Sequence, residues 1–219
     1  MSEVNLVSIS NPGSYTGCNS ASELVAWAAR VSNPSNQNNT ATSSRLIQYL
    51  IKNQHWSPFE IVHVAMEIKT TRDIARQILR HRSFSFQEYS QRYADPTKDL
   101  NFVVRETRLQ DKKNRQNSIE SDDARLAKSW ENRQEYLTSI AKEQYQWAIE
   151  NGIAKEQARA VLPEGLTESR IYMNGTLRSW IHFIELRSAN GTQKEHQLIA
   201  KECAKVIATV FPLASEFVE

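Results

Sequence analysis

The clearest pattern in the chain is an alternation of apolar and polar residues between residues 61 and 69. A period of two predicts a β-strand with one buried face and one exposed face. The positions expected to face the core are Val62, Val64, Met66 and Ile68. Shorter extended segments are expected at residues 4–9, 100–104 and 170–173.

Most other apolar residues recur every three or four positions, which predicts amphipathic helices. Ser20 and Glu23 form a capping box, which marks the start of one helix. Thr192 and Glu195 form a second box and predict another start. The longest helix is expected from about Asp123 to Glu150. Its apolar stripe consists of Leu126, Trp130, Leu137, Ile140 and Ala148.

Strands and helices together indicate an α+β fold that is rich in helix. Further helices are expected around residues 46–50, 71–79, 155–161 and 177–184. Residues 105–123 are charged and show no apolar period, so we expect a variable loop there. Neither repeats nor a flexible linker divide the sequence, and we expect residues 1–219 to form a single domain.

The overall charge argues against a general nucleic-acid-binding protein. The chain has 27 Lys and Arg residues against 25 Asp and Glu residues, for a net charge of +2. Proteins that bind nucleic acid without specificity are usually strongly basic. The sequence lacks both a signal peptide and the roughly 18 consecutive apolar residues of a membrane helix. We therefore expect a cytoplasmic protein that contacts neither nucleic acid nor membrane.

The cysteine, histidine and glycine patterns narrow the chemistry further. Cys18 and Cys203 lie far apart, which is typical of free thiols in a reducing compartment, although one disulfide is the alternative. The five histidines show none of the spacings of a catalytic metal site, so no metal is expected. Glycine-rich phosphate loops are also missing. Any bound phosphate would have to be neutralised by cationic side chains.

A cationic group of this kind is found at Arg80-His81-Arg82, at the end of the helix expected after Thr71. Cations at a helix C-terminus also offset the helix dipole, by up to about 1 kcal/mol, and that structural role is the alternative. Arg binds phosphate oxygens with a fork of two N–H groups, which favours a phosphate-bearing ligand.

Glu88, Ser90 and Arg92 follow this group and alternate along the chain. In an extended loop the three side chains would point the same way and offer one ligand an acceptor, a hydroxyl and a fork donor. This combination suits a nucleotide. The alternative for Ser90 is a local turn hydrogen bond.

This stretch resembles the signature of the flavin-dependent thymidylate synthase (ThyX) family. Arg80-His81-Arg82, seven further residues and then Ser90 reproduce its RHR-x7-S motif, and Gln91-Arg92-Tyr93 also fits. Four other segments are similar to family segments in the right order. They are residues 28–32, the His-Trp-Ser-Pro-Phe-Glu run at 55–60, the Ala-Arg-Ala-Val-Leu-Pro run at 158–163, and residues 177–187.

The resemblance implies a twisted antiparallel sheet flanked by helices and assembly into a homotetramer. It also implies methylation of dUMP at C5 to give dTMP. The carbon donor would be 5,10-methylenetetrahydrofolate, and NADPH would supply reducing equivalents through FAD. The family uses no cysteine nucleophile, which suits a chain without an evident activated Cys.

The resemblance also assigns site residues. Those expected to bind FAD are Ser32, His55, Ser57, Arg80, His81, Arg82, Glu88, Thr176, Arg178 and His182. Those expected to bind dUMP are Gln77, Arg80, Glu88, Ser90, Gln91, Arg92, Arg159 and Arg187. Arg187 would be catalytic, because a permanently protonated guanidinium near the uracil can stabilise a developing anion at N3.

Several of these residues have ordinary structural alternatives. Arg159 and Arg187 could be cations at helix C-termini. His182 lies in the apolar run 180–184, where a buried core histidine is usual. Ser57 precedes Pro58 and could serve a turn.

Two other functions remain compatible with the sequence. The arginine cluster could bind single-stranded nucleic acid with Phe86, Tyr89 and Tyr93 as stacking platforms. Such a protein would bind with strong salt dependence and carry no chromophore. Alternatively, the chain could be an inactive relative that binds FAD and forms the oligomer without turnover.

Overall fold

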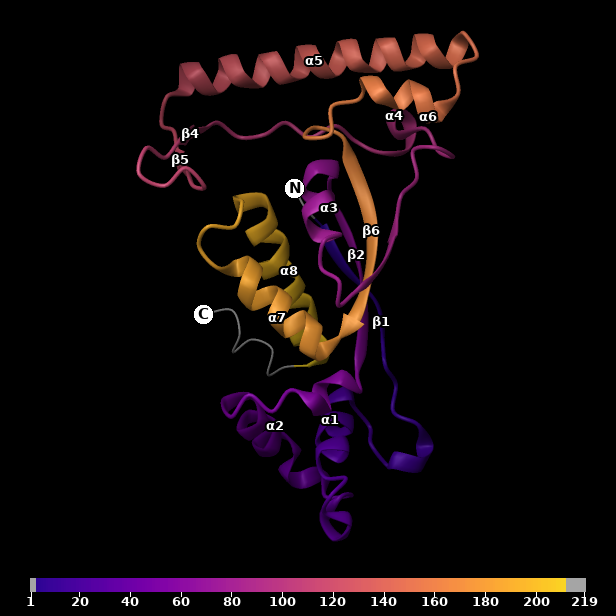
Figure 1. The fold of residues 1–219 in the computed structure, drawn as a ribbon, viewed down its shortest axis with the longest axis vertical. Helices are drawn as coiled ribbons and strands as arrows, with labels where there is room; N and C mark the ends of the chain where they lie inside the picture. The colour runs from indigo at the N-terminus through magenta and orange to yellow at the C-terminus, as the bar shows by residue number, and fades with distance from the viewer. Residues whose placement is uncertain (1–2, 212–219) are drawn as a thin grey trace.

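A four-stranded antiparallel sheet forms the centre of the computed structural model, which describes residues 3–211 (Figure 1). The strand order is β1-β2-β6-β3. The strands are β1 (Glu3–Ile9), β2 (His63–Thr71), β6 (Glu168–Thr176) and β3 (Ser85–Glu88). The antiparallel sheet flanked by helices agrees with the expected fold class.

The period of two in β2 has the predicted consequence. Val64, Met66 and Ile68 are completely buried, and β6 matches them by placing Met173 opposite Met66 and Ile171 opposite Ile68. This face packs against α7 (Leu177–Ser188) and α8 (Lys194–Val210). The other face carries mostly polar residues, among them Glu67, Lys69 and Arg170, which are only partly buried.

The remaining helices lie at the two ends of the sheet (Figure 1). At one end, α1 (Ala21–Ala29) packs against α2 (Ser43–Lys52). At the other end, α5 (Ala124–Glu150) lies across the molecule beside α4 (Pro96–Asp99) and α6 (Lys155–Ala158). The short helix α3 (Arg72–Ile78) follows β2 directly. Single 3-10 turns lie at Ser14–Thr16, Pro34–Asn36, Thr40–Thr42, Ser57–Glu60 and Arg159–Val161.

Two of the expected local structures are wrong. Residues 100–104 do not form a strand, since only Phe102 makes an isolated bridge, to Thr167. The loop expected at residues 105–123 instead contains a small hairpin of β4 (Arg108–Gln110) and β5 (Ser118–Glu120). Both differences arise because strand pairing depends on the partner available in three dimensions.

The two capping boxes had different outcomes. The Ser20 hydroxyl accepts a hydrogen bond from the Glu23 N–H at 3.2 Å, as predicted. The box at Thr192 is wrong, because α8 is capped by Gln193 without a side-chain hydrogen bond. The Glu195 carboxylate pairs with Arg105 and Arg108 and accepts a hydrogen bond from the side chain of the N-cap residue Gln193, so it does not complete a box with Thr192.

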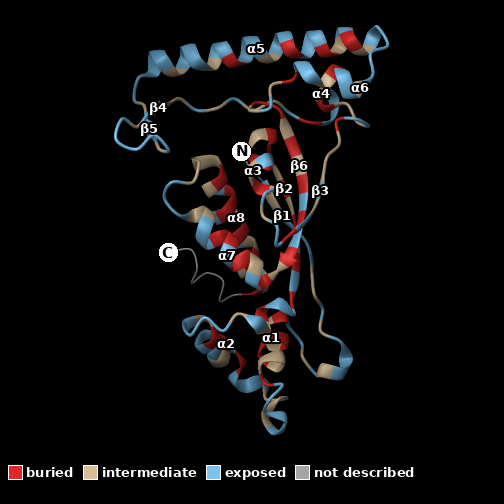
Figure 2. Cartoon of the chain, viewed as in Figure 1, coloured by how far each residue is buried: buried red, intermediate tan, exposed pale blue. Residues whose placement is uncertain are grey.

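The long helix α5 has the predicted bounds, but most of its apolar stripe is not covered (Figure 2). Leu126, Trp130, Leu137 and Ile140 are 36–51% exposed. The side that packs on the chain instead carries Gln134, Ala141, Tyr145 and Ala148. The stripe is therefore available to another molecule.

No helix within residues 3–211 is long and apolar enough to cross a membrane. Both cysteines are free thiols. Cys203 is fully buried in α8, and burial raises the pKa of its thiol, whereas Cys18 is partly exposed.

Candidate functional site

The Arg80-His81-Arg82 motif lies beyond the end of α3, which corrects its expected place in the last helical turn. The chain turns here, with the Phe84 N–H bonded to the His81 carbonyl at 3.3 Å. A turn lets the three side chains point in different directions. Arg80 and Arg82 are exposed, and their side chains make no ion pair in the part of the chain that the structure describes.

His81 points inward and meets a residue more than 100 positions away. Its Nε2 accepts a hydrogen bond from Nε of Arg187 at 2.9 Å. Burial, together with the Arg187 charge, lowers the pKa of His81 to about 4. The imidazole is therefore neutral near pH 7 and acts as an acceptor. Arg187 lies in the last turn of α7, where a cation would also offset the helix dipole. Its side chain nevertheless makes a specific hydrogen bond, to His81.

Aromatic packing holds the turn in place. The Phe84 ring lies 4.8 Å from the Trp180 ring and 6.0 Å from the Phe183 ring, measured between centroids. The Phe183 ring is 5.0 Å from His81. Gly175 on β6 makes room for Phe84, because a Cβ there would lie only 2.4 Å from a ring carbon.

Gln77 lies in α3, four residues before His81, and has two side-chain partners at the start of α8, the N-cap residue Gln193 and His196. Its Nε2 donates to Oε1 of Gln193 at 2.8 Å, and its Oε1 is 3.3 Å from Nδ1 of His196. The His196 ring is 6.3 Å from the His81 ring. His196 is fully buried, and burial, with the charges of Arg187 and His81, lowers its pKa to about 3.

Sequence reasoning missed both α8 residues. The sequence did contain a signal for His196. It lies three residues before Ile199 and four before Ala200, so the helical period places it on the buried stripe of α8.

A second group surrounds Glu88 at the end of β3. Its Oε1 accepts a hydrogen bond from the Ser169 hydroxyl at 2.8 Å and is 3.7 Å from Nη1 of Arg72. The Arg72 side chain is only 9% exposed, and burial lowers its pKa. Arg72 was not predicted, because a charged residue at a helix start usually faces solvent.

Ser90 begins a turn, so the prediction of an extended loop through Glu88, Ser90 and Arg92 is wrong. The N–H groups of Tyr93 and Ala94 bond to the Ser90 carbonyl at 3.1 and 3.2 Å. The Ser90 hydroxyl accepts from the Arg92 N–H at 3.4 Å, which is the local turn bond considered as an alternative. The three side chains consequently do not share one face.

The turn brings Arg92 close to Arg159 instead. Arg92 pairs with the Glu156 carboxylate at 3.2 Å, and Nε of Arg159 donates to the Glu156 carbonyl at 3.3 Å. Gln91 is buried, and its Nε2 has no hydrogen-bond partner among the described residues. We call Gln91, Arg92 and Arg159 the basic cluster.

A third group contains Ser57, Arg178 and His182. Arg178 pairs with Glu60, and the His182 ring lies 5.2 Å from the Trp56 ring. The His182 side chain is 47% exposed, so its interpretation as a core histidine is wrong.

The other residues expected at the flavin lie near the same end of the fold. Thr176 caps α7 by accepting from the Ser179 N–H at 3.1 Å. His55 is exposed beside Tyr49, and Ser32 is exposed. Within residues 3–211, no hydrogen bond or ion pair joins Arg178 or His182 to the His81–Arg187 pair.

The donor set fits anionic ligands better than a metal. In the described chain, no three His, Cys, Asp or Glu side chains gather in a way that could hold a metal ion. The free guanidinium groups of Arg80 and Arg82, and the unsatisfied Gln91 amide, suit phosphate oxygens. These residues can therefore hold a phosphate-bearing cofactor and a nucleotide.

Comparison with known proteins gives a consistent answer. A family model described as thymidylate synthase complementing protein matches residues 14–213. A probable flavin-dependent thymidylate synthase of Paramecium bursaria Chlorella virus 1 is 48% identical over 207 residues, covering 94% of each chain. A flavin-dependent thymidylate synthase of Synechocystis is 44% identical over 196 residues, covering 90% of this chain and 88% of the relative.

Solved structures show the same fold. A UMP/dUMP methylase, PolB from Streptomyces cacaoi bound with 5-Br dUMP, superposes with a TM-score of 0.79 at 28% identity, covering 99% of this chain and 94% of that one. Its complex with 5-Br UMP gives a TM-score of 0.81 at 27% identity, covering 99% and 93%.

Proposed function

The chain belongs to the flavin-dependent thymidylate synthase family, and from that premise we propose that it methylates dUMP at C5 to form dTMP. FAD would supply the reducing electrons when bound, with NADPH as their source and 5,10-methylenetetrahydrofolate as the carbon donor. The PolB structures support a uracil nucleotide as the substrate, since that relative was solved with brominated dUMP and UMP.

The contact between Arg187 and His81 is the observation that carries this proposal. It joins the RHR motif to the arginine that the family resemblance assigns to the uracil. Because Arg187 uses Nε to bond His81, its two terminal nitrogens remain for a ligand. A guanidinium held in this way stabilises negative charge on the uracil as C5 becomes nucleophilic, and it keeps its own proton.

The basic cluster would hold the rest of dUMP. Arg92 and Arg159 lie on either side of Glu156 and supply fork donors for the phosphate. The buried Gln91 Nε2, which has no partner among the described residues, is a further donor. Glu88 uses Oε1 for both Ser169 and Arg72, which leaves Oε2 for a ligand hydroxyl.

The flavin would be held by side-chain cations. Arg80 and Arg82 are exposed and free to bind its phosphates, while Ser57, Arg178 and His182 form the separate third group. No hydrogen bond or ion pair joins these two sets of residues within the described chain. We propose that a homotetramer unites them, so that each site takes residues from more than one subunit.

Two surfaces support this self-association. The exposed stripe of α5, with Leu126, Trp130, Leu137 and Ile140, is large and apolar and has no cover of its own. The outer face of the sheet is also open, with Tyr172 42% exposed. An exposed apolar stripe such as the one on α5 is typical of subunit interfaces, and the polar outer face of the sheet would add hydrogen-bonding groups at its rim.

The nucleic-acid alternative is less well supported. The Tyr89 hydroxyl donates to Asp99 at 2.9 Å, and Phe86 packs partly against the core. Only Tyr93, at 78% exposure, is available among the three proposed stacking residues. One ring does not make a platform for successive bases.

The test is formation of dTMP by the purified protein. We expect product, measured by chromatography, only when dUMP, methylenetetrahydrofolate, NADPH and FAD are all present. Omitting each component in turn is the control. A protein that binds FAD and dUMP but makes no dTMP would be the inactive relative, and the proposal would be wrong.

A further inference from the structure

Four polar side chains form a continuous hydrogen-bonded chain between α3 and α8. Nε2 of Gln193 donates to Oε2 of Glu195 at 2.9 Å, and Oε1 of Gln193 accepts from Nε2 of Gln77 at 2.8 Å. Oε1 of Gln77 then faces Nδ1 of His196 at 3.3 Å. We call these residues the amide chain. Gln77 is its centre, and it is also a residue expected to contact dUMP.

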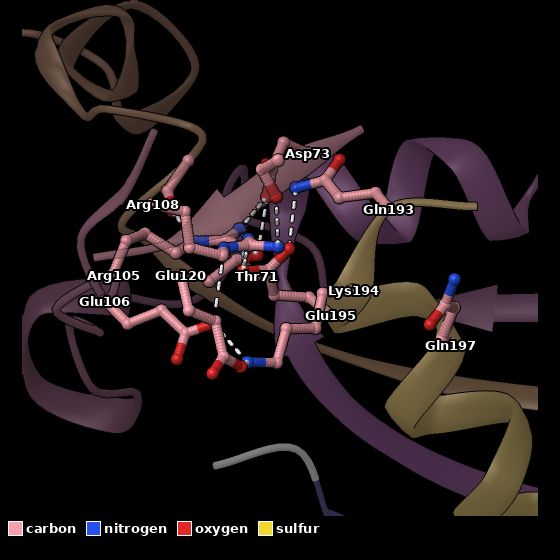
Figure 3. Close-up of polar contacts among 12 residues, drawn as sticks. Thr71, Asp73, Arg105, Glu106, Arg108, Glu120, Gln193, Lys194, Glu195 and Gln197 are labelled. Carbon is pink, nitrogen blue, oxygen red and sulfur yellow. Dashed lines mark hydrogen bonds and ion pairs between the residues drawn. The ribbon is translucent and has the colours of Figure 1, made fainter. Parts of the chain in front are cut away.

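Glu195 fixes the direction of the amide chain at one end. An ionised carboxylate can only accept hydrogen bonds. Burial alone would raise the pKa of Glu195, but hydrogen bonds from its own N–H, Gln193 and Arg108, together with the charge of Arg105, hold the pKa below its usual value. Figure 3 shows both arginines directed at this carboxylate.

Because Glu195 only accepts hydrogen bonds, it determines the orientation of each amide group in the amide chain in turn. Gln193 must turn its NH2 group to Glu195, so its oxygen faces Gln77. Gln77 must then present its NH2 group to Gln193, which leaves its oxygen facing His196. Reversing either amide would place two acceptors or two donors against each other.

His196 closes the other end. Its ring is neutral near pH 7, since its pKa is about 3. Facing the Gln77 oxygen, Nδ1 must carry the proton and donate. Nε2 is then a bare acceptor, and it is buried without a partner among the described residues. A buried acceptor without a partner costs free energy, and an apolar residue would avoid that cost. A histidine fits this position because its Nδ1 donates to Gln77.

Gln77 retains one unused donor and one unused acceptor. Nε2 has a second hydrogen, and Oε1 has a second lone pair. The His196 ring, which Gln77 contacts, lies 6.3 Å from the ring of His81, and His81 accepts the hydrogen bond of Arg187. The amide therefore belongs to the same group as the arginine assigned to the uracil.

We propose that the amide chain locks the Gln77 side chain in one orientation and thereby selects uracil over cytosine. The inference rests on the proposed function, because it requires a pyrimidine at Gln77. Uracil presents an N3–H donor beside a carbonyl acceptor, whereas cytosine presents an N3 acceptor beside an amino donor. A freely rotating amide pairs with either base. A locked amide that matches uracil opposes cytosine donor to donor and acceptor to acceptor.

Gln193, His196 and Glu195 are consequently positioning residues for base selection. The test measures the affinities of dUMP and dCMP for the flavin-loaded enzyme by calorimetry and takes their ratio. Gln193→Met removes one anchor of Gln77, and His196→Phe removes the other. Gln197→Met is the matched control, since Gln197 is on the same helix and also donates two hydrogen bonds, to the carbonyls of Ala189 and Thr192.

We expect the wild-type enzyme to prefer dUMP and both anchor variants to lower the dUMP/dCMP affinity ratio by about tenfold or more. The Gln197→Met control should keep the wild-type ratio. Glu195→Gln keeps the shape of the side chain but adds an amide group that can donate hydrogen bonds. It should also lower the dUMP/dCMP affinity ratio, and it replaces the other variants if they do not fold.

A merely structural role would weaken both nucleotides in parallel, and an unchanged ratio in the folded variants would overturn the inference. That result is distinct from failure of the proposed function. In the latter case the wild-type enzyme would form no dTMP, whatever its affinity ratio for dUMP and dCMP.

Discussion

Replacing Gly175 by alanine should disturb the turn that carries the RHR motif. A Cβ at position 175 would lie 2.4 and 2.6 Å from two carbons of the Phe84 ring. Carbon atoms in contact normally stay about 3.5–4.0 Å apart, so the ring has to move by about 1 Å. Phe84 packs on Trp180 and Phe183, which leaves little space for that movement.

The expected cost follows from this overpacking. Forcing an extra methyl group into a packed core costs about 1–3 kcal/mol. For a chain of this size each kcal/mol lowers the melting temperature by about 2–4 °C, so we expect a decrease of about 2–12 °C. The Phe84 ring is 6.5 Å from the His81 ring, and its displacement should also reduce kcat/KM for dUMP.

The assay is thermal unfolding combined with dTMP formation. Gly13→Ala is the control, because a Cβ there would have no atom within 4 Å. Phe84→Leu should relieve the clash, so Gly175→Ala should cost less in that background than in the wild type. Equal melting temperatures for Gly175→Ala and Gly13→Ala, or an equal cost of Gly175→Ala in both backgrounds, would refute the reasoning.

Three further predictions follow from the site. Arg187→Ala should abolish dTMP formation while the oligomer persists in light scattering, because we propose that its charge faces the uracil; normal turnover would contradict the role. Ser90→Ala should weaken dUMP binding but leave some turnover, because we propose that Ser90 positions the ligand; complete loss of chemistry with unchanged dUMP affinity would instead indicate a nucleophile. Lowering the pH from 7 to 5 should reduce the free energy of unfolding in urea. His81 and His196 have pKa values of about 4 and about 3 when folded, below the ordinary 6.5, so below pH 6.5 the unfolded chain binds protons that the folded protein does not. His196→Phe should flatten this pH dependence, and a wild-type profile that is already flat would rule out the explanation.

Local patterns in the sequence predicted the elements whose structure depends on local forces. The alternation in β2 and the bounds of α5 were confirmed, because periodic burial and helix caps act over short distances. The apolar stripe of α5 was also identified, but the sequence could not show that the chain leaves it exposed. Whether the stripe is covered depends on which other elements pack against α5.

The errors occur where distant segments decide the structure. Glu88 pairs with Arg72 and Ser169, and the chain turns at Ser90, so the expected extended alternation through Arg92 fails. Glu195 pairs with the distant Arg105 and Arg108, and the Thr192 hydroxyl donates to the Leu186 carbonyl, so the second capping box does not form. Spacing within one segment carries no information on such contacts.

Among the site residues, those that belong to a sequence motif were identified, and those whose role depends on a contact with a distant segment were missed. The RHR motif and the segment resemblance identified His81 and Arg187, which the fold brings into contact. His196 and Gln193 were missed because their importance depends on Gln77, which lies on a different helix.

The central claim is that arginine and histidine side chains from separate segments form one pocket for two anionic ligands. The most direct measurement is the absorption spectrum of the bound flavin during titration with dUMP. We predict a saturable spectral change that requires a higher dUMP concentration in Arg159→Ala. If dUMP binds by calorimetry and leaves the flavin spectrum unchanged, the two ligands do not share a pocket and the claim is wrong.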